Sequence, residues 1–267
     1  MRKNRTILLV FVVVAVLLSS CQKVIRLDLN SSSPQLVIQG NVYDEAGPYV
    51  VTISRTVNFD APSLYPPVTN ATVTISDNAG VAEELSQTTD GMYVTSNLQG
   101  VVGGTYTLTV QVDGKTYTAS STMPEAVGID TIYYKKQIFG AGQLITMDFR
   151  NQPDKENFYR VIHLVNGKQV DGFSIISERT DSVTTIAYSF MSTVNRPNDT
   201  TTKKLEKGDR IDVWLECIDK GVFEYFRTAN REGGQNASPA NPVSNINNGA
   251  LGYFNACSVR KRTIIYQ

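Results

Sequence analysis

Apolar and polar residues alternate along much of the chain after residue 35, which is the period-two pattern of half-buried β-strands. In residues 105–112 every even-numbered residue is apolar, and the others are threonine or glutamine. Asp113 and Gly114 come next, a pair that readily takes the positive φ angles of a two-residue hairpin turn, and residues 115–122 return as a second strand. The pattern therefore predicts a β-hairpin over residues 105–122.

The same alternation recurs in shorter segments through the first half of the chain. These segments are residues 36–40, 49–55, 71–77, 83–87 and 92–96. Together with the hairpin they predict an immunoglobulin-like or transthyretin-like β-sandwich over residues 35–124. Pro124 and the short run that follows it, up to Gly128, mark the end of this domain.

The second half, residues 128–267, is also rich in predicted strands, with one helix among them. Strands are expected at residues 130–135, 144–150, 158–165, 183–190, 209–217, 251–259 and 263–266. Val222, Tyr225, Phe226 and Ala229 follow the spacing of an apolar helix face, which predicts a helix over about 220–231 that ends before two glycines. The expected fold class is all-β: a sandwich followed by a second β-rich domain with one short helix.

The first 34 residues have a different pattern. Three basic residues precede an apolar run of twelve residues, 7–18, and two serines separate that run from Cys21. This order is typical of an export signal, and twelve residues are too few for a transmembrane helix, which needs roughly twenty. The ending at residues 18–21 resembles the bacterial lipobox. We therefore expect cleavage before Cys21, with diacylglycerol on its sulfur and an acyl chain such as palmitate on its amine; the alternative is an ordinary secretory leader.

The expected organisation of the N-terminus follows from this assignment. Residues 1–20 form the lipoprotein signal peptide, and residues 21–34 form the lipidated N-terminus and a polar leash. Each buried methylene contributes ~0.8 kcal/mol, so two or three acyl chains hold a protein on a membrane where one does so only marginally. The membrane, bound through Cys21, is thus a predicted partner.

The net charge of the chain argues against one class of partner. The chain has 25 basic and 25 acidic residues, and the leader holds three of the basic residues and no acidic one. The mature chain is therefore mildly acidic, which argues against nucleic-acid binding, because that binding depends on neutralising phosphates.

Candidate catalytic chemistry is sparse. His163 is the only histidine and lies within a predicted strand, so a catalytic triad or a zinc site would have to be built around it alone; a structural strand histidine is the simpler interpretation. Asp212 and Glu216 share the polar face of another predicted strand, where they could form a glycosidase pair or belong to a solvated sheet face. The sequence predicts no enzyme, no cofactor and no metal site.

Three further features carry hypotheses. Cys217 and Cys257 can form a disulfide that closes a loop of 40 residues, which the chain-entropy model values at roughly 4 kcal/mol, or they can remain two buried thiols. The stretch 233–248 is rich in glycine, asparagine and proline and is long for a connection, so it is a candidate binding loop. Its candidate contact residues are Pro239, Asn241, Pro242 and Asn245. Tyr65, which lies between two prolines, is a candidate exposed aromatic residue for binding a glycan.

Several segments carry a family resemblance. Residues 21–29, 48–51, 66–75, 105–110 and above all 238–254 resemble a lipoprotein family of Bacteroidota known as domain of unknown function 4249. The resemblance implies an outer-membrane lipoprotein of the cell envelope, often encoded near TonB-dependent receptors, and implies no reaction and no catalytic residues. Surface-displayed lipoproteins of that phylum often have acidic residues after the lipidated cysteine, whereas this chain has Gln22 and Lys23, so the periplasmic and surface faces both remain open.

Two functions are therefore expected. The first is a non-catalytic accessory or ligand-binding partner of a TonB-dependent outer-membrane transporter. The alternative is a glycan-binding or adhesion module of the cell envelope.

Overall fold

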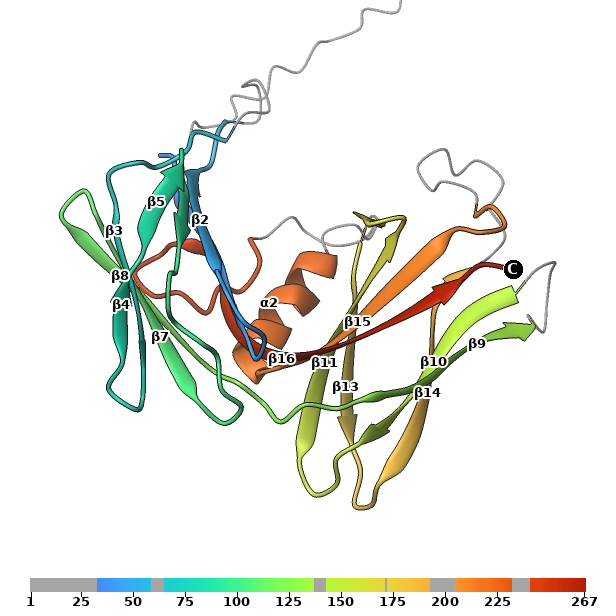
Figure 1. Ribbon diagram of the computed structural model, residues 1–267. Coiled ribbons are helices and arrows are strands. Elements are labelled where there is room, and N and C mark those ends of the chain that lie inside the picture. Colours follow the sequence, from blue (N-terminus) through green and yellow to red (C-terminus); the bar gives the residue numbers. More distant parts are fainter. Residues whose placement is uncertain (1–32, 59–64, 137–142, 171, 193–204, 232–240) are drawn as a thin grey trace, which may run out of the picture. The chain divides into compact units, whose positions relative to one another are not determined.

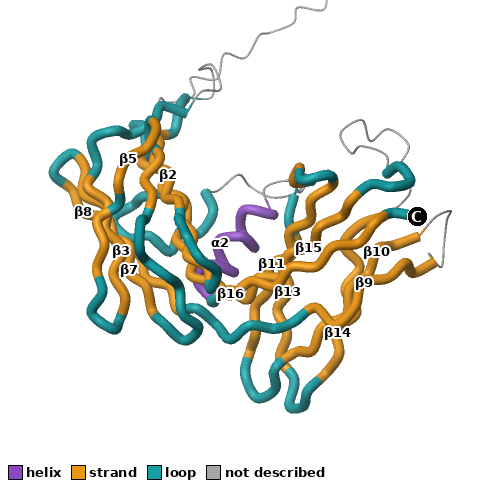
Figure 2. The backbone as a smooth tube through the Cα atoms, in the orientation of Figure 1, coloured by secondary structure: helices purple, strands orange, loops and turns teal. Residues whose placement is uncertain are grey.

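The computed structural model describes residues 33–58, 65–136, 143–170, 172–192, 205–231 and 241–267 (Figure 1). The predicted signal peptide, Cys21 and nearly all of the leash lie outside these residues. The described part is mostly strand with one helix, as Figure 2 shows, so the predicted all-β class is confirmed.

The first half of the chain forms a β-sandwich of two sheets. One layer contains four strands of the largest described sheet: β1 (Leu36–Tyr43), β2 (Val50–Arg55), β6 (Met92–Val94) and β5 (Ser86–Thr89). The other layer is a four-stranded sheet in the order β4 (Ala82–Glu84), β3 (Thr72–Asp77), β7 (Thr105–Val112) and β8 (Lys115–Thr122). Asp113 and Gly114 have φ angles of 51° and 71°, as the predicted hairpin between β7 and β8 requires.

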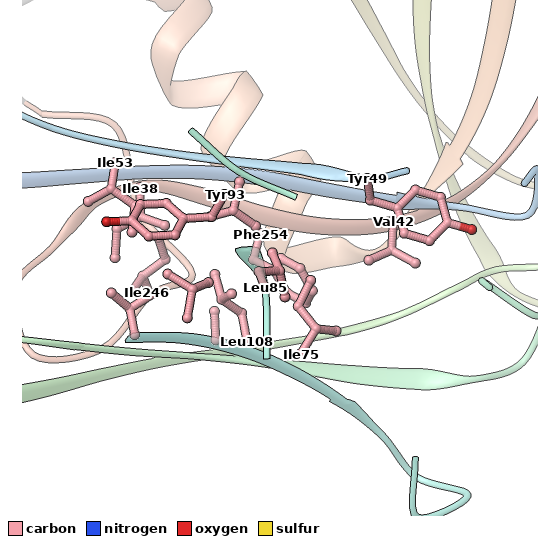
Figure 3. Close-up of a cluster of buried hydrophobic side chains, with 14 of the residues drawn as sticks. Ile38, Val42, Tyr49, Ile53, Ile75, Leu85, Tyr93, Leu108, Ile246 and Phe254 are labelled. Atoms are coloured by element: carbon pink, nitrogen blue, oxygen red, sulfur yellow. The ribbon is translucent and has the colours of Figure 1, made fainter. Parts of the chain in front are cut away.

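Alternate residues of these strands fill the first core. Ile38 and Ile53 point inward from one sheet, and Ile75 and Leu108 meet them from the other (Figure 3). Phe254 lies in the same core although it comes from the far end of the chain (Figure 3). The first sandwich is thus completed by residues well outside 35–124.

The second half forms another pair of layers. A three-stranded sheet has the order β14 (Thr184–Ser192), β10 (Gln143–Asn151) and β9 (Ile129–Lys136). The layer packed against it belongs to the largest described sheet and holds β12 (Lys168–Gln169), β11 (Glu156–Val165), β13 (Ser174–Arg179), β15 (Arg210–Ile218) and part of β16 (Leu251–Ile265). Strand β13 was not predicted.

Strand β16 joins the two halves. Its first seven residues pair in parallel with β1, and its remaining residues pair antiparallel with β15. Two separate strands were predicted here, at 251–259 and 263–266, and that division was wrong. The charged residues Arg260, Lys261 and Arg262 interrupt the apolar alternation, but they stay in register with β15, and Arg260 and Lys261 form ion pairs with Asp44 and Glu45.

The one described helix, α2 (Lys220–Arg231), has the predicted bounds. It begins after Asp219, whose Oδ1 accepts a hydrogen bond from the Val222 backbone N–H at 2.9 Å and so caps the first turn. Val222 and Phe226 face a small cluster with Cys257, between the helix and the sheet. This helix therefore covers part of the outward face of the large sheet, beside β16.

Candidate ligand-binding pocket

A pocket of about 390 Å³ lies on the outward face of the first sandwich, where β16, β1 and β2 run side by side. The register of these strands shows which residues form the floor of the pocket. Val37 is the partner of Leu251 on one side and of Ser54 on the other, and Gln39 is similarly paired with Thr52. Because successive side chains of a strand point to opposite faces, these residues face outward while Ile38 and its neighbours fill the core.

The rim of the pocket comes from three other segments. It consists of Tyr65, Tyr225 of α2, and Pro242. We call this site the tyrosine pocket. Tyr65 is 66% exposed, so its ring is available to a ligand. Tyr225 is partly buried, because its ring packs against the rings of Tyr253 and Phe226 at centroid distances of 4.9 and 5.2 Å.

A glycine allows the floor to form. Gly252 has a φ of +97°, and a Cβ atom at this position would lie 1.9 Å from the backbone oxygen of Ile38. Any other residue would therefore collide with β1 and would also be strained. Glycine here lets β16 approach β1 closely under the pocket.

The described residues that line the tyrosine pocket carry no charge. The floor offers an amide at Gln39 and hydroxyls at Thr52 and Ser54, and these groups can both donate and accept hydrogen bonds. Val37, Leu251 and Pro242 add apolar surface. A site of this kind can bind a small uncharged molecule that has both polar and apolar faces.

A buried ion pair supports the aromatic side of the pocket. Arg160 Nε donates to Glu216 Oε2 at 2.6 Å, and both side chains are buried. The guanidinium lies 4.2 Å from the centroid of the Phe226 ring, which in turn packs 4.8 Å from Tyr253. Burial lowers the pKa of Arg160, but the Glu216 carboxylate more than offsets this effect and holds the pKa above its ordinary value.

The same ion pair also affects Tyr43. Burial and the nearby Glu216 carboxylate raise the pKa of the Tyr43 phenol, so it stays protonated at any ordinary pH. The polar groups beneath α2 therefore form a fixed structural cluster of one carboxylate, one guanidinium and one phenol.

The described part of the candidate binding loop, residues 241–248, contributes one residue to the pocket. Pro242 lines the pocket, and Asn241 Nδ2 donates to Gln35 Oε1 at 3.4 Å near it. Asn245 has a different role. Its Oδ1 accepts a hydrogen bond from the Phe254 backbone N–H at 3.0 Å, and its Nδ2 donates to the Phe254 carbonyl at 2.7 Å. The side chain thus makes the hydrogen bonds that a neighbouring strand would make. Pro239 lies outside the described residues.

Sequence reasoning identified Tyr65 and Pro242 but missed Tyr225, Gln39 and Thr52. Tyr225 was assigned to the buried face of the helix. The signal for Gln39 and Thr52 was present, because each holds a polar position in an alternating strand, but nothing local shows that these two strands and α2 meet around one cavity.

The other candidate chemical groups lie elsewhere. His163 is only 8% exposed, and its Nδ1 has no hydrogen-bond partner among the described residues. Burial lowers the pKa of this imidazole. Asp212 and Glu216 are four residues apart on one strand, which separates their Cα atoms by roughly 13 Å. Glu216 is also engaged by Arg160, so the two acids do not form a glycosidase pair, whose carboxyl groups lie about 5 to 9.5 Å apart.

The disulfide considered between Cys217 and Cys257 is not formed in the structure, where both thiols are free and buried. Register explains why. Cys217 is the partner of Ser258, so these two side chains share a face, and Cys257, the residue before Ser258, points to the opposite face. Cys217 lies in the second core and Cys257 lies in the cluster under α2.

Within the described ranges, no helix has the length and apolar character that crossing a membrane would need. No group of three or more potential metal-ligating side chains occurs within those ranges either.

The fold and the pocket define a class: a β-rich protein of two joined sandwiches with an uncharged pocket on an outward sheet face. The chain belongs to the family described as Domain of unknown function (DUF4249), whose model matches residues 22–263. A comparison with curated proteins found no match.

Two solved structures, both described as a cytokine receptor complex (crystal forms 1A and 2), align with 70% of this chain. They are 9% and 8% identical, with 85% and 92% of their own chains covered, and both have a TM-score of 0.26. A score of this size establishes no common fold.

Proposed function

We propose that this protein is a non-catalytic lipoprotein of the outer membrane that binds a small ligand in the tyrosine pocket and assists a TonB-dependent transporter. The observation that carries the proposal is the pocket itself. Its volume of about 390 Å³ falls within the range of about 300–1,000 Å³ for small-molecule sites, and its floor is a hydrogen-bonded sheet.

The position of the pocket in the chain suits an anchored protein. Val37, on the floor, is 16 residues after Cys21. An extended chain spans at most about 3.6 Å per residue, so the pocket can lie no more than roughly 58 Å from a lipid attached at Cys21. A ligand bound there would be held within reach of a transporter in the same membrane.

The anchor is tested by metabolic labelling with an alkyne analogue of palmitate. We expect the wild-type chain to incorporate the label and Cys21→Ala to incorporate none. Cys217→Ala is the matched control, because it removes a different thiol and leaves the lipobox intact. Label that persists in Cys21→Ala would contradict lipidation at this residue.

The transporter partnership is tested by affinity capture from detergent-solubilised envelopes. A tag placed after the exposed Gln267 leaves the N-terminus unchanged, and we expect a TonB-dependent transporter to co-purify. An unrelated tagged lipoprotein serves as the control. Failure to recover a transporter, under conditions that preserve a known transporter–lipoprotein complex, would overturn this part of the proposal.

The two tyrosines on the rim favour a second candidate, a glycan-binding or adhesion module of the envelope. This function needs no transporter. Binding of a glycan by the purified protein, together with repeated absence of a transporter from the captured material, would favour the module over the transporter partner.

A further inference from the structure

We infer that the tyrosine pocket recognises a neutral saccharide. This inference rests on the proposed function, in that it names the class of ligand the pocket takes. Four features of the pocket carry it: the aromatic rim, the polar floor, the lack of charge, and strands beneath whose edges are already paired or covered.

The aromatic rim suits the apolar faces of a sugar ring. A pyranose presents C–H groups on its faces and hydroxyls around its edge, and aromatic rings pack well against flat surfaces of this kind. Tyr65 and Tyr225 supply such rings from two separate segments. The ring of Tyr225 is held in place by Tyr253, Phe226 and, below them, the Arg160–Glu216 ion pair.

The floor suits the edge hydroxyls. A sugar hydroxyl both donates and accepts hydrogen bonds, and so do the Gln39 amide and the Thr52 and Ser54 hydroxyls. An entirely apolar ligand would cover the Gln39 amide and the Ser54 hydroxyl without offering them hydrogen bonds, so it fits the floor less well than a sugar does.

The lack of charge argues against ionic ligands. A carboxylate or phosphate in the pocket would lose water without gaining a counter-ion from its lining residues. Arg55, the last residue of β2, forms an ion pair with Asp113. An acidic saccharide is therefore a poorer fit than a neutral one.

The pairing of the strands argues against an extended peptide. Peptides commonly bind by adding a strand to an open sheet edge. Here β1 lies between β16 and β2, and β2 lies between β1 and β6. The first part of β16 has no described strand on its other side, but side chains cover that edge: the Ser244 hydroxyl donates to the Gly252 carbonyl, and Asn245 bonds the Phe254 backbone. The pocket must recognise its ligand through side chains.

The test is ligand-observed saturation-transfer NMR with the detergent-solubilised full chain. Three sets of probes are compared: neutral gluco-, galacto-, manno- and xylo-oligosaccharides, uronic-acid oligosaccharides, and neutral tripeptides. We expect binding from the neutral saccharides, and we expect its strength to be nearly independent of salt because no ion pair is involved.

Two variants locate the binding. Tyr65→Ala removes an exposed ring and should weaken binding by about tenfold, the size of a well-packed aromatic contact. Gln39→Leu removes the floor amide while nearly keeping its size, and should weaken binding by severalfold. Gln111→Leu is the matched control, because Gln111 is also an exposed strand glutamine of the first sandwich but lies on β7; the variant should bind like wild type. Thermal unfolding of each variant checks that it is folded.

Each contrary outcome has a distinct meaning. Preference for uronic-acid saccharides or tripeptides would overturn the neutral-saccharide assignment, although the pocket would still be a ligand-binding site. Saccharide binding that Tyr65→Ala and Gln39→Leu leave unchanged would place it outside the pocket and overturn the inference. If no probe binds but a transporter is still captured, the inference fails and the partnership stands; if a saccharide binds and no transporter is captured, the inference holds and the partnership fails.

Discussion

At the scale of single residues, His163 should make stability depend on pH. Burial lowers the pKa of the folded imidazole, whereas the unfolded chain has an ordinary value near 6.5. As the pH falls, His163 is therefore protonated in the unfolded chain before it is protonated in the folded protein. The stability from a neutral buried His163 is therefore fully present above about pH 6.5 and is lost as the pH falls toward the folded pKa.

The measurement is urea unfolding at pH 7.5, 6.5 and 5.5, using a purification tag without histidine. Because the chain has one histidine, this part of the pH dependence should disappear in His163→Gln. Equal pH dependence in the variant and in the wild type would contradict the assignment.

The cysteines provide a second test at this scale. Burial raises the pKa of Cys217 to about 11 and the pKa of Cys257 well above its ordinary value, so neither thiol should react with a disulfide reagent in the folded protein at pH 8. In unfolded, unreduced protein we expect two reactive thiols. If no thiol reacts, Cys217 and Cys257 form a disulfide. If three thiols react, the sulfur of Cys21 carries no lipid.

At the scale of elements, the start of α2 connects three parts of the fold. Asp219 caps the helix through Oδ1, and its Oδ2 accepts a hydrogen bond from the Ser121 hydroxyl on β8. The Ser121 oxygen accepts in turn from the Ala256 backbone N–H on β16 at 2.9 Å. The helix that carries Tyr225 is thus attached to both sheets of the first sandwich.

Asp219→Ala should lower the free energy of unfolding by about 1–2 kcal/mol through loss of the cap, and by more if Ser121 is left without its acceptor. Asp219→Asn keeps a capping oxygen and should cost less. Urea unfolding of the two variants and the wild type measures the difference. Equal losses in both variants would show that the cap contributes little.

At the scale of the whole molecule, β16 should make the two sandwiches unfold together. Its first part completes the first core and its second part pairs with β15. We therefore predict that Gly252→Ala, placed where β16 touches β1, destabilises both halves by about 3 kcal/mol or more. Gly249→Ala is the matched control. It also has positive φ but has open space around it, and should cost about 1–2 kcal/mol.

Trp214 gives a direct readout, because it is the only tryptophan and lies on β15 in the second half. In urea its fluorescence should change at the same midpoint as the circular dichroism of the sheets, and Gly252→Ala should shift both midpoints equally. A shift in the circular dichroism that leaves the Trp214 transition unchanged would mean that the halves unfold independently.

Much of the local structure could be predicted from the sequence, because its causes lie within a few residues. Alternation fixed the faces of β7, the pair Asp113 and Gly114 closed its hairpin, and the spacing of Val222, Tyr225 and Phe226 set the bounds of α2. The sequence predicted a strand break near Arg260, but β16 continues through it. The local pattern cannot show that a charged segment remains paired to a neighbouring strand.

The sequence by itself thus determined most of the strands, the helix and the family to which the chain belongs. Only the tertiary structure decided that Leu251 lies beside Val37, that Cys217 and Cys257 face opposite ways, and that Tyr65 and Tyr225 border one pocket. The physical reason is that alternation records which residues share a face of a strand. It does not record which strand will be its neighbour, because pairing between residues more than two hundred positions apart depends on the register and packing of the assembled sheets.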